Sequence, residues 1–231
     1  IVIPDLEPGM PYCVQVQAVA ANGKKSDLSA YKSITYIPQV KPVVTLTNQS
    51  DGISAQWKAI SGAEKYMLCY KETSGSTWTT VRTANLNYTL SNLTPGTQYS
   101  VYVKPVFNGC KGLASATVSK TYVPQVKTTV TLSNKTNGIR AGWTKITGAT
   151  KYIVYYRAVG VSTWTSKETT NLYYTVTGLS PGTQHFFRVK PVYGTANGLY
   201  SDTVSLTYVP QVTTTVTLAN KSNGIRADWS S

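Results

Sequence analysis

The pentapeptide Tyr36-Ile37-Pro38-Gln39-Val40 returns twice in this sequence, as Tyr122-Val123-Pro124-Gln125-Val126 and as Tyr208-Val209-Pro210-Gln211-Val212. Each step is 86 residues long (122 − 36 and 208 − 122). Between these marks the copies align without a gap, and about half of their positions are identical. Such a period is too long for a solenoid unit, which cannot fold alone, and it suits an independent small domain. The repeat therefore predicts a tandem array of small domains.

The repeat divides the chain into four parts. We expect residues 1–37 to form the C-terminal half of a module, residues 38–123 and 124–209 to form two complete modules, and residues 210–231 to start a further one. A natural protein is not expected to begin and end within a domain. We therefore expect this sequence to be a piece of a longer protein.

Within one repeat, the hydrophobic pattern has a period of two residues. Tyr66, Leu68 and Tyr70 alternate with more polar neighbours, and so do Tyr99, Val101 and Val103. This alternation is typical of strands with one face in a core and the other in water. Turn signals separate the strands; they are Asp51-Gly52, Asn137-Gly138 and Asn223-Gly224, and we expect them to supply the positive φ of tight hairpin turns. The pattern predicts all-β antiparallel sandwiches with no helix.

Three segments of each repeat carry a family resemblance. They are Trp57, Tyr66 to Tyr70 and Leu93 to Val103 in one copy, and Trp143, Tyr152 to Tyr156 and Leu179 to Val189 in the next. This combination resembles fibronectin type III modules over essentially the whole chain. The resemblance implies tandem immunoglobulin-like β-sandwiches arranged end to end. The Gly-Ala-x-Lys-Tyr segments at Gly62 and Gly148 are most similar to bacterial cell-surface members.

The family has a structural tyrosine, the tyrosine corner, which falls here on Tyr12 and Tyr99. The third copy has His185, the single histidine of the chain. No second histidine, cysteine or carboxylate stands at metal-ligand spacing from it, so a catalytic or metal role is disfavoured. We expect His185 to be a structural substitute that makes a poorer hydrogen bond than tyrosine.

Composition narrows the class of protein further. The net charge is +13, spread over every repeat without a block of like charges, and no nucleic-acid recognition motif accompanies it. The pattern favours solubility and attraction to polyanions such as acidic glycans. Three cysteines, Cys13, Cys69 and Cys110, stand at non-equivalent places in the repeats, which indicates free thiols. No apolar run reaches the ~20 residues of a membrane span.

Motifs for catalysis are missing from the sequence. It contains no Gly-x-Ser-x-Gly elbow, phosphate loop, His-Glu-x-x-His helix or Cys-x-x-Cys pair. The junctions carry Pro-Gln-Val where an inter-module calcium site would need clustered carboxylates. We therefore expect no enzyme, no cofactor and no metal site in this chain.

One surface is a candidate for interaction. The resemblance makes the third and sixth strands neighbours in one sheet, so their outward side chains share a face. In the second complete module these are Ile153, Tyr155, Arg157, Phe186, Arg188 and Lys190. In the first they are Met67, Cys69, Lys71, Tyr102 and Lys104. Such a face can engage an acidic glycan, a surface protein or another array. The alternative is an aromatic ladder that only stabilises the sheet.

Asparagine triplets recur at one point of the repeat. Asn48, Asn134 and Asn220 each begin an Asn-x-Ser/Thr sequence, and Asn87 and Asn92 begin two more. In a eukaryotic secretory protein these are glycan acceptors, whereas in a bacterial one the first three are plain turn residues. The resemblance favours the second interpretation.

Three functions fit these expectations, all of them extracellular, at a cell surface or secreted. The first is a spacer or stalk that presents an adhesive or enzymatic head. The second is an adhesin whose repeats bind host protein or acidic glycan. The third is an accessory segment of a secreted glycan-degrading enzyme. Prolines at the junctions restrict bending between modules, which favours the spacer.

Overall fold

The computed structural model describes residues 1–229, which form β-strands and turns and contain no helix. The chain divides into two compact units, residues 1–124 and 125–231. The four-part division predicted from the repeat is finer than this and stays a prediction. No helix in residues 1–229 is long and apolar enough to cross a bilayer.

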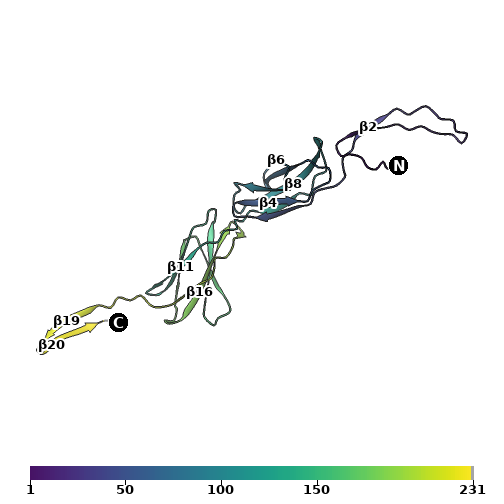
Figure 1. Ribbon diagram of the computed structural model, residues 1–231. Coiled ribbons are helices and arrows are strands. Elements are labelled where there is room, and N and C mark those ends of the chain that lie inside the picture. Colours follow the sequence, from purple (N-terminus) through teal and green to yellow (C-terminus); the bar gives the residue numbers. More distant parts are fainter. Residues whose placement is uncertain (230–231) are drawn as a thin grey trace. The chain divides into compact units, whose positions relative to one another are not determined.

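The first complete module consists of two antiparallel sheets (Figure 1). One has the order β3-β4-β7, and the other has the order β10-β8-β5-β6 with β9 beside β8. The strands are β3 (Val44–Asn48), β4 (Gly52–Trp57), β5 (Lys65–Glu72), β6 (Thr79–Thr83), β7 (Asn87–Ser91), β8 (Gln98–Phe107), β9 (Cys110–Lys111) and β10 (Val118–Thr121). The chain crosses from one sheet to the other between β4 and β5, between β6 and β7 and between β7 and β8, as in a sandwich.

The second complete module repeats this topology strand for strand. Its sheets have the orders β11-β12-β15 and β14-β13-β16-β17, with β18 also pairing with β16. The strands are β11 (Val130–Lys135), β12 (Gly138–Trp143), β13 (Lys151–Ala158), β14 (Thr165–Thr169), β15 (Tyr173–Thr177), β16 (Gln184–Tyr193), β17 (Ala196–Asn197) and β18 (Val204–Thr207). Edge strand β14 carries the charged side chains Lys167 and Glu168, both exposed, and edge strand β6 carries the exposed Arg82.

Each module closes its own core between its two sheets. In the first module Ile53 and Leu90 of one sheet face Leu68 of the other, and all three are fully buried. In the second, Ile139 and Phe187 have the corresponding role. Trp57 packs on Tyr66, with ring centroids 5.6 Å apart, and Trp143 packs on Tyr152 at the same distance. The alternation of the sequence thus buries one side of each strand.

Gly52 and Gly138, which begin the second strand of each module, were expected to supply a positive φ, but the structure gives a different reason for glycine there. Gly52 and Gly138 do not have a positive φ. A Cβ on Gly52 would instead overlap the carbonyl oxygen of Leu90, and one on Gly138 would overlap that of Val176. The prediction of a positive φ was therefore wrong at these two positions, because the constraint is the close approach of the neighbouring strand.

The tyrosine corner occurs at both positions where the sequence predicts it. The Tyr12 hydroxyl accepts the backbone N–H of Glu7 at 2.8 Å, and the Tyr99 hydroxyl accepts that of Thr94 at 3.0 Å. In the third copy, the His185 side chain is buried, with 5% of its surface exposed. Its Nδ1 lies 3.1 Å from the Thr183 carbonyl oxygen. A carbonyl oxygen can only accept, so the ring nitrogen donates in this hydrogen bond, whereas the hydroxyl of the tyrosine corner accepts a backbone N–H.

The terminal parts are hairpins. At the N-terminal end, β1 (Pro11–Val14) pairs with β2 (Lys32–Thr35), and at the C-terminal end β19 (Val216–Lys221) pairs with β20 (Gly224–Trp229). Most of their side chains are exposed, including Ile34 at 71% and Trp229 at 70%. Neither hairpin has a second sheet to pack on within residues 1–229, so neither contributes to a module core.

Candidate functional site

The candidate face of the second module is built on the pairing of β13 with β16. Their register places Arg157 opposite Phe186, Tyr155 opposite Arg188, and Ile153 opposite Lys190. Because side chains alternate between the two faces of a strand, these three pairs form successive rows on the side away from the core. Each row contributes one cation.

Aromatic rings and cations alternate along these rows. We call the set the ladder; it comprises Tyr155, Arg157, Trp164, Phe186, Arg188, Lys190 and Tyr200. The Arg157 Cζ lies 4.8 Å from the ring centroid of Phe186 and 5.1 Å from that of Trp164. The Arg188 Cζ lies 4.5 Å from Trp164 and 4.1 Å from Tyr200. Each distance is within the ~6 Å at which a cation is attracted to a ring face.

The third cation completes the ladder at its far end. The Lys190 Nζ lies 4.8 Å from the Tyr200 ring centroid and 5.5 Å from that of Tyr155. Those two rings also pack on each other edge to face, 5.3 Å apart. The ladder therefore has three cations and four aromatic rings, and each cation contacts at least two rings.

Within the described part of the chain, the ladder cations have no acidic partner. The ion pairs formed within residues 1–229 are Lys127–Asp202, Lys151–Glu168 and Arg226–Asp228, and none includes a ladder residue. Arg157 uses one terminal nitrogen to donate to the Val161 carbonyl oxygen at 2.6 Å. The Nε atoms of Arg157 and Arg188 are buried and have no hydrogen-bond partner within the described residues. The positive charge of this face is thus not neutralised.

Tyr200 titrates differently because of its place in the ladder. A hydrogen bond with the Tyr155 side chain lowers the pKa of the Tyr200 hydroxyl, and the charges of Lys190 and Arg188 lower it further, while partial burial opposes them. Its pKa is therefore below the ordinary value of 10.0. The Tyr155 hydrogen bond is the main cause of this shift, and the ladder cations add to it.

The sequence located most of this site, and missed two residues of it. Tyr155, Arg157, Phe186, Arg188 and Lys190 come together as expected, whereas Ile153 shares their face without belonging to the ladder. Trp164 was missed although it repeats Trp78 at the step of 86 residues, which is the signal that could have found it. Tyr200 lies between β17 and β18, where strand alternation gives no information.

The first module carries a reduced version of the same face. Lys71 lies over Trp78 at 5.3 Å and Lys104 over Tyr102 at 5.6 Å. Like Arg157, Lys71 donates to a turn carbonyl, that of Gly75, at 2.6 Å. Positions 69, 100, 102 and 114 hold Cys, Ser, Tyr and Ala, where the second module has the ladder residues Tyr155, Phe186, Arg188 and Tyr200.

Two residues predicted to be exposed on the first module are buried. Met67 is 9% exposed and Cys69 is 3% exposed. Neighbouring side chains cover Cys69: its Sγ lies 3.4 Å from the Thr80 Oγ1, and its hydrogen bond with Tyr102 raises the pKa of that hydroxyl. The expectation of exposure was wrong here because side chains from both adjacent strands close over the small thiol.

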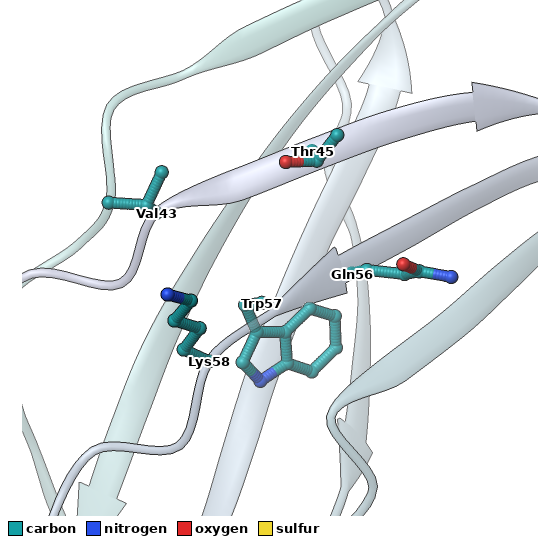
Figure 2. Close-up of a pocket in the computed structure, with 5 residues that line it drawn as sticks. All are labelled: Val43, Thr45, Gln56, Trp57 and Lys58. Carbon is teal, nitrogen blue, oxygen red and sulfur yellow. The ribbon is translucent and has the colours of Figure 1, made fainter.

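The surface of the first module has shallow hollows. One, of about 410 Å³, lies beside β3 and β4 and is lined by Val43, Thr45, Gln56, Trp57 and Lys58. Figure 2 shows Lys58 and Gln56 on either side of Trp57, with Val43 and Thr45 on the neighbouring stretch. This lining has no carboxylate, imidazole or thiol. Residues 1–229 also contain no cluster of three or more His, Cys, Asp or Glu residues that could hold a metal ion.

Two of the asparagine triplets have a structural role. The Asn48 Nδ2 donates to the Thr121 carbonyl oxygen at 3.1 Å, and the Asn134 Nδ2 donates to that of Thr207 at 3.1 Å. Each bond joins the first strand of a module to its last strand. Asn48 lies in β3 and Asn134 lies in β11, so the expectation that they are plain turn residues was wrong. Asn220 lies in β19.

Comparison with known proteins agrees with this fold. The family model "Fibronectin type III domain" matches residues 38–121, so the family expected from the sequence is confirmed for the first complete module. A two-domain fibronectin type III segment of chicken tenascin covers 72% of this chain and 98% of its own length, with a TM-score of 0.58 and 17% identity. The predicted fold class, tandem fibronectin type III β-sandwiches, is thereby confirmed.

Relatives in sequence are tenascins of animals. Rat Tenascin-R is 23% identical over 204 residues, which is 85% of this chain, and mouse Tenascin-N is 26% identical over 210 residues, which is 87%. The chain spans 15% of the length of the former and 13% of the latter. These relatives do not support the expected likeness to bacterial members.

Proposed function

We propose that this chain is part of a non-catalytic extracellular spacer, in which tandem sandwiches hold an adhesive or enzymatic head at a distance. The observation that carries the proposal is the separation of the two cores, which share no residue and close around their own Trp57 or Trp143. A module with a core of its own can be added or removed without disturbing its neighbour. The number of modules then sets the length of the protein.

Two further observations support the spacer. The tenascin relatives are extracellular matrix proteins, in agreement with the extracellular location expected from the sequence. Each complete module is followed directly by Pro-Gln-Val, with no Gly/Ser tether. Proline fixes φ and restricts the hinge, so successive modules add length rather than slack. The longest strands, β8 and β16, have 10 residues each, so at ~3.3 Å per residue one module is expected to add about 30 Å.

The exact repeat gives a direct test of the spacer. Deleting residues 124–209 joins Val123 to Pro210 and restores the Tyr-Val-Pro-Gln-Val junction. We expect small-angle X-ray scattering to show a maximum dimension about 30 Å shorter than that of the full chain. The matched control deletes residues 38–123, which joins Ile37 to Pro124 and should shorten the chain equally. An unchanged maximum dimension in both deletions would contradict a spacer.

The ladder favours a second function, that of an adhesin. Three half-buried cations on one sheet face, with no ion pair within residues 1–229, are a feature that a pure spacer does not need, and the first module lacks most of it.

A further inference from the structure

The ladder carries a local excess of positive charge that no acidic side chain within residues 1–229 neutralises. Arg157, Arg188 and Lys190 are half-buried on one sheet face, and none has an ion pair within residues 1–229. The chain as a whole has 22 Lys and Arg residues but 9 Asp and Glu residues. A ligand for this face must therefore bring the negative charge.

The rings hold the cations in fixed orientations. Trp164 and Tyr200 both lie within 4.5 Å of the Arg188 Cζ, and the Arg188 Nε has no hydrogen-bond partner within the described residues. Its buried Nε leaves the two terminal nitrogens as donors. A planar guanidinium in a fixed orientation fits the paired oxygens of a carboxylate or sulfate, and little entropy is lost when it binds them.

The spacing of the cations favours a chain-like ligand. Arg157, Arg188 and Lys190 occupy successive rows of the sheet. Rows on one face are two residues apart, which is about 7 Å. A polymer that carries an acidic group on successive units can contact all three cations at once, so its affinity gains from multivalency.

The ladder is less suited to a folded protein partner. Protein interfaces depend on aromatic anchors that enter pockets of the partner. Here Tyr155, Trp164, Phe186 and Tyr200 are each already stacked with a cation of the same ladder. What the face still offers is a row of positive charge and hydrogen-bond donors.

We infer that the ladder of the second module binds an acidic polysaccharide, whose carboxylate or sulfate groups pair with Arg157, Arg188 and Lys190. This function is independent of the spacer, since it belongs to one face of one module. Arg188 is the central contact because it stands in the middle row and lies over three rings, those of Tyr155, Trp164 and Tyr200. The first module, with Tyr102 at the equivalent position, contributes little.

The test compares two double variants of the full chain that lose the same charge. R188Q/K190Q removes two ladder cations. The control R140Q/K145Q removes two cations of the same module from outside the ladder: Arg140 lies over Tyr173 at 3.8 Å on the other sheet, and Lys145 is exposed. Isothermal titration calorimetry at about 0.15 M salt uses dextran sulfate, polygalacturonate and neutral dextran as probes.

We expect the wild-type chain to bind one or both acidic probes but not neutral dextran. R188Q/K190Q should weaken binding about tenfold or more, because two charge-assisted contacts are lost. R140Q/K145Q should weaken it less than about threefold, because those charges act only at long range. The two acidic probes show whether carboxylate or sulfate is preferred. Equal losses in both variants, or no binding to either acidic probe, would overturn the inference.

A spectroscopic readout shows that the variant affects the ladder itself. Lys190 and Arg188 both lower the pKa of Tyr200, so R188Q/K190Q should raise this pKa back toward 10.0. Absorbance titration of the tyrosines measures the change, and circular dichroism checks that the module is folded. A variant that weakens binding while the tyrosine titration stays unchanged would contradict the stacked geometry on which the inference rests.

Two further experiments distinguish polysaccharide binding by the ladder from binding of other polyanions and from binding elsewhere in the chain. Poly-L-glutamate or a single-stranded oligonucleotide bound as tightly through the same residues would overturn the assignment to polysaccharide. Deleting residues 124–209 should abolish binding, while deleting residues 38–123 should preserve it. Because both deletions shorten the chain equally, failure of this pattern is distinguishable from failure of the spacer.

Discussion

Tyrosine hydroxyls act as backbone acceptors in both complete modules and in the N-terminal part of the chain. Besides the tyrosine corner, the Tyr66 hydroxyl accepts the Ile60 N–H at 2.8 Å, and the Tyr152 hydroxyl accepts the Ile146 N–H at 2.8 Å. Each bond ties a loop to the strand that follows it. Because the N–H of a buried loop needs an acceptor, the ring oxygen stabilises the loop as well as filling the core.

His185 stands where the other copies have the tyrosine of the corner, and replacing it with tyrosine is expected to stabilise the second module. His185→Tyr should place a hydroxyl where the N–H of Ser180 can donate to it, as Thr94 does to Tyr99 in the first module. We expect the second module to become more stable by about 1 kcal/mol, the net value of one hydrogen bond. Thermal unfolding measures the gain, and His185→Phe, which lacks the hydroxyl, is the control. An unchanged or lowered Tm for His185→Tyr would count against this interpretation.

Among the elements, β12 has two glycines with opposite requirements. Gly138 faces the β15 backbone, with no room for a Cβ beside Val176. A Cβ on Gly142 would have its nearest neighbour, the Thr131 Oγ1, at 3.7 Å, an ordinary contact. The first module confirms the difference, since Gly52 is kept and position 56 is glutamine.

Alanine substitutions in β12 test this distinction. Gly138→Ala should destabilise the second module by about 1–3 kcal/mol, because the β12–β15 pairing has to open to admit the methyl group. Gly142→Ala should leave stability unchanged or raise it by about 0.5–1 kcal/mol, because it restricts the unfolded chain. Urea denaturation of both variants measures the two values. The same loss at both positions would show that sheet propensity, rather than the close approach, decides.

These elements also show what the sequence could predict. Alternation along β5 and β8 is a local signal, so the strands, their inward faces and the sandwich could be predicted from it. The role of Gly52 could not, because it depends on the carbonyl oxygen of Leu90 in a strand that is distant in sequence. The same limit explains why Tyr200 was missed and why Cys69 was expected to be exposed: cross-strand neighbours place the first in the ladder and cover the second.

Because each complete module has a core of its own, we expect the two modules to unfold in separate transitions. Leu68 is fully buried in the first core and Phe187 in the second. Leu68→Ala should cost the first module about 2–5 kcal/mol and Phe187→Ala should cost the second about 3–5 kcal/mol. Differential scanning calorimetry of the full chain should show that each variant lowers one transition and leaves the other in place.

The opposite result would be a joint shift of the transitions. If Leu68→Ala and Phe187→Ala each lowered every transition together, the modules would unfold as one cooperative unit. Stability would then depend on the neighbouring module, and the spacer proposal would lose its physical basis.

The charged edge strands have a consequence for how such a chain folds. Neighbouring modules that share half of their sequence are held at high local concentration, so a partly folded strand can pair with the wrong copy. Lys167 and Glu168 on β14, and Arg82 on β6, make the open edges poor templates for such mispairing. A protein made of near-copies can in this way be extended by duplication without becoming prone to aggregation.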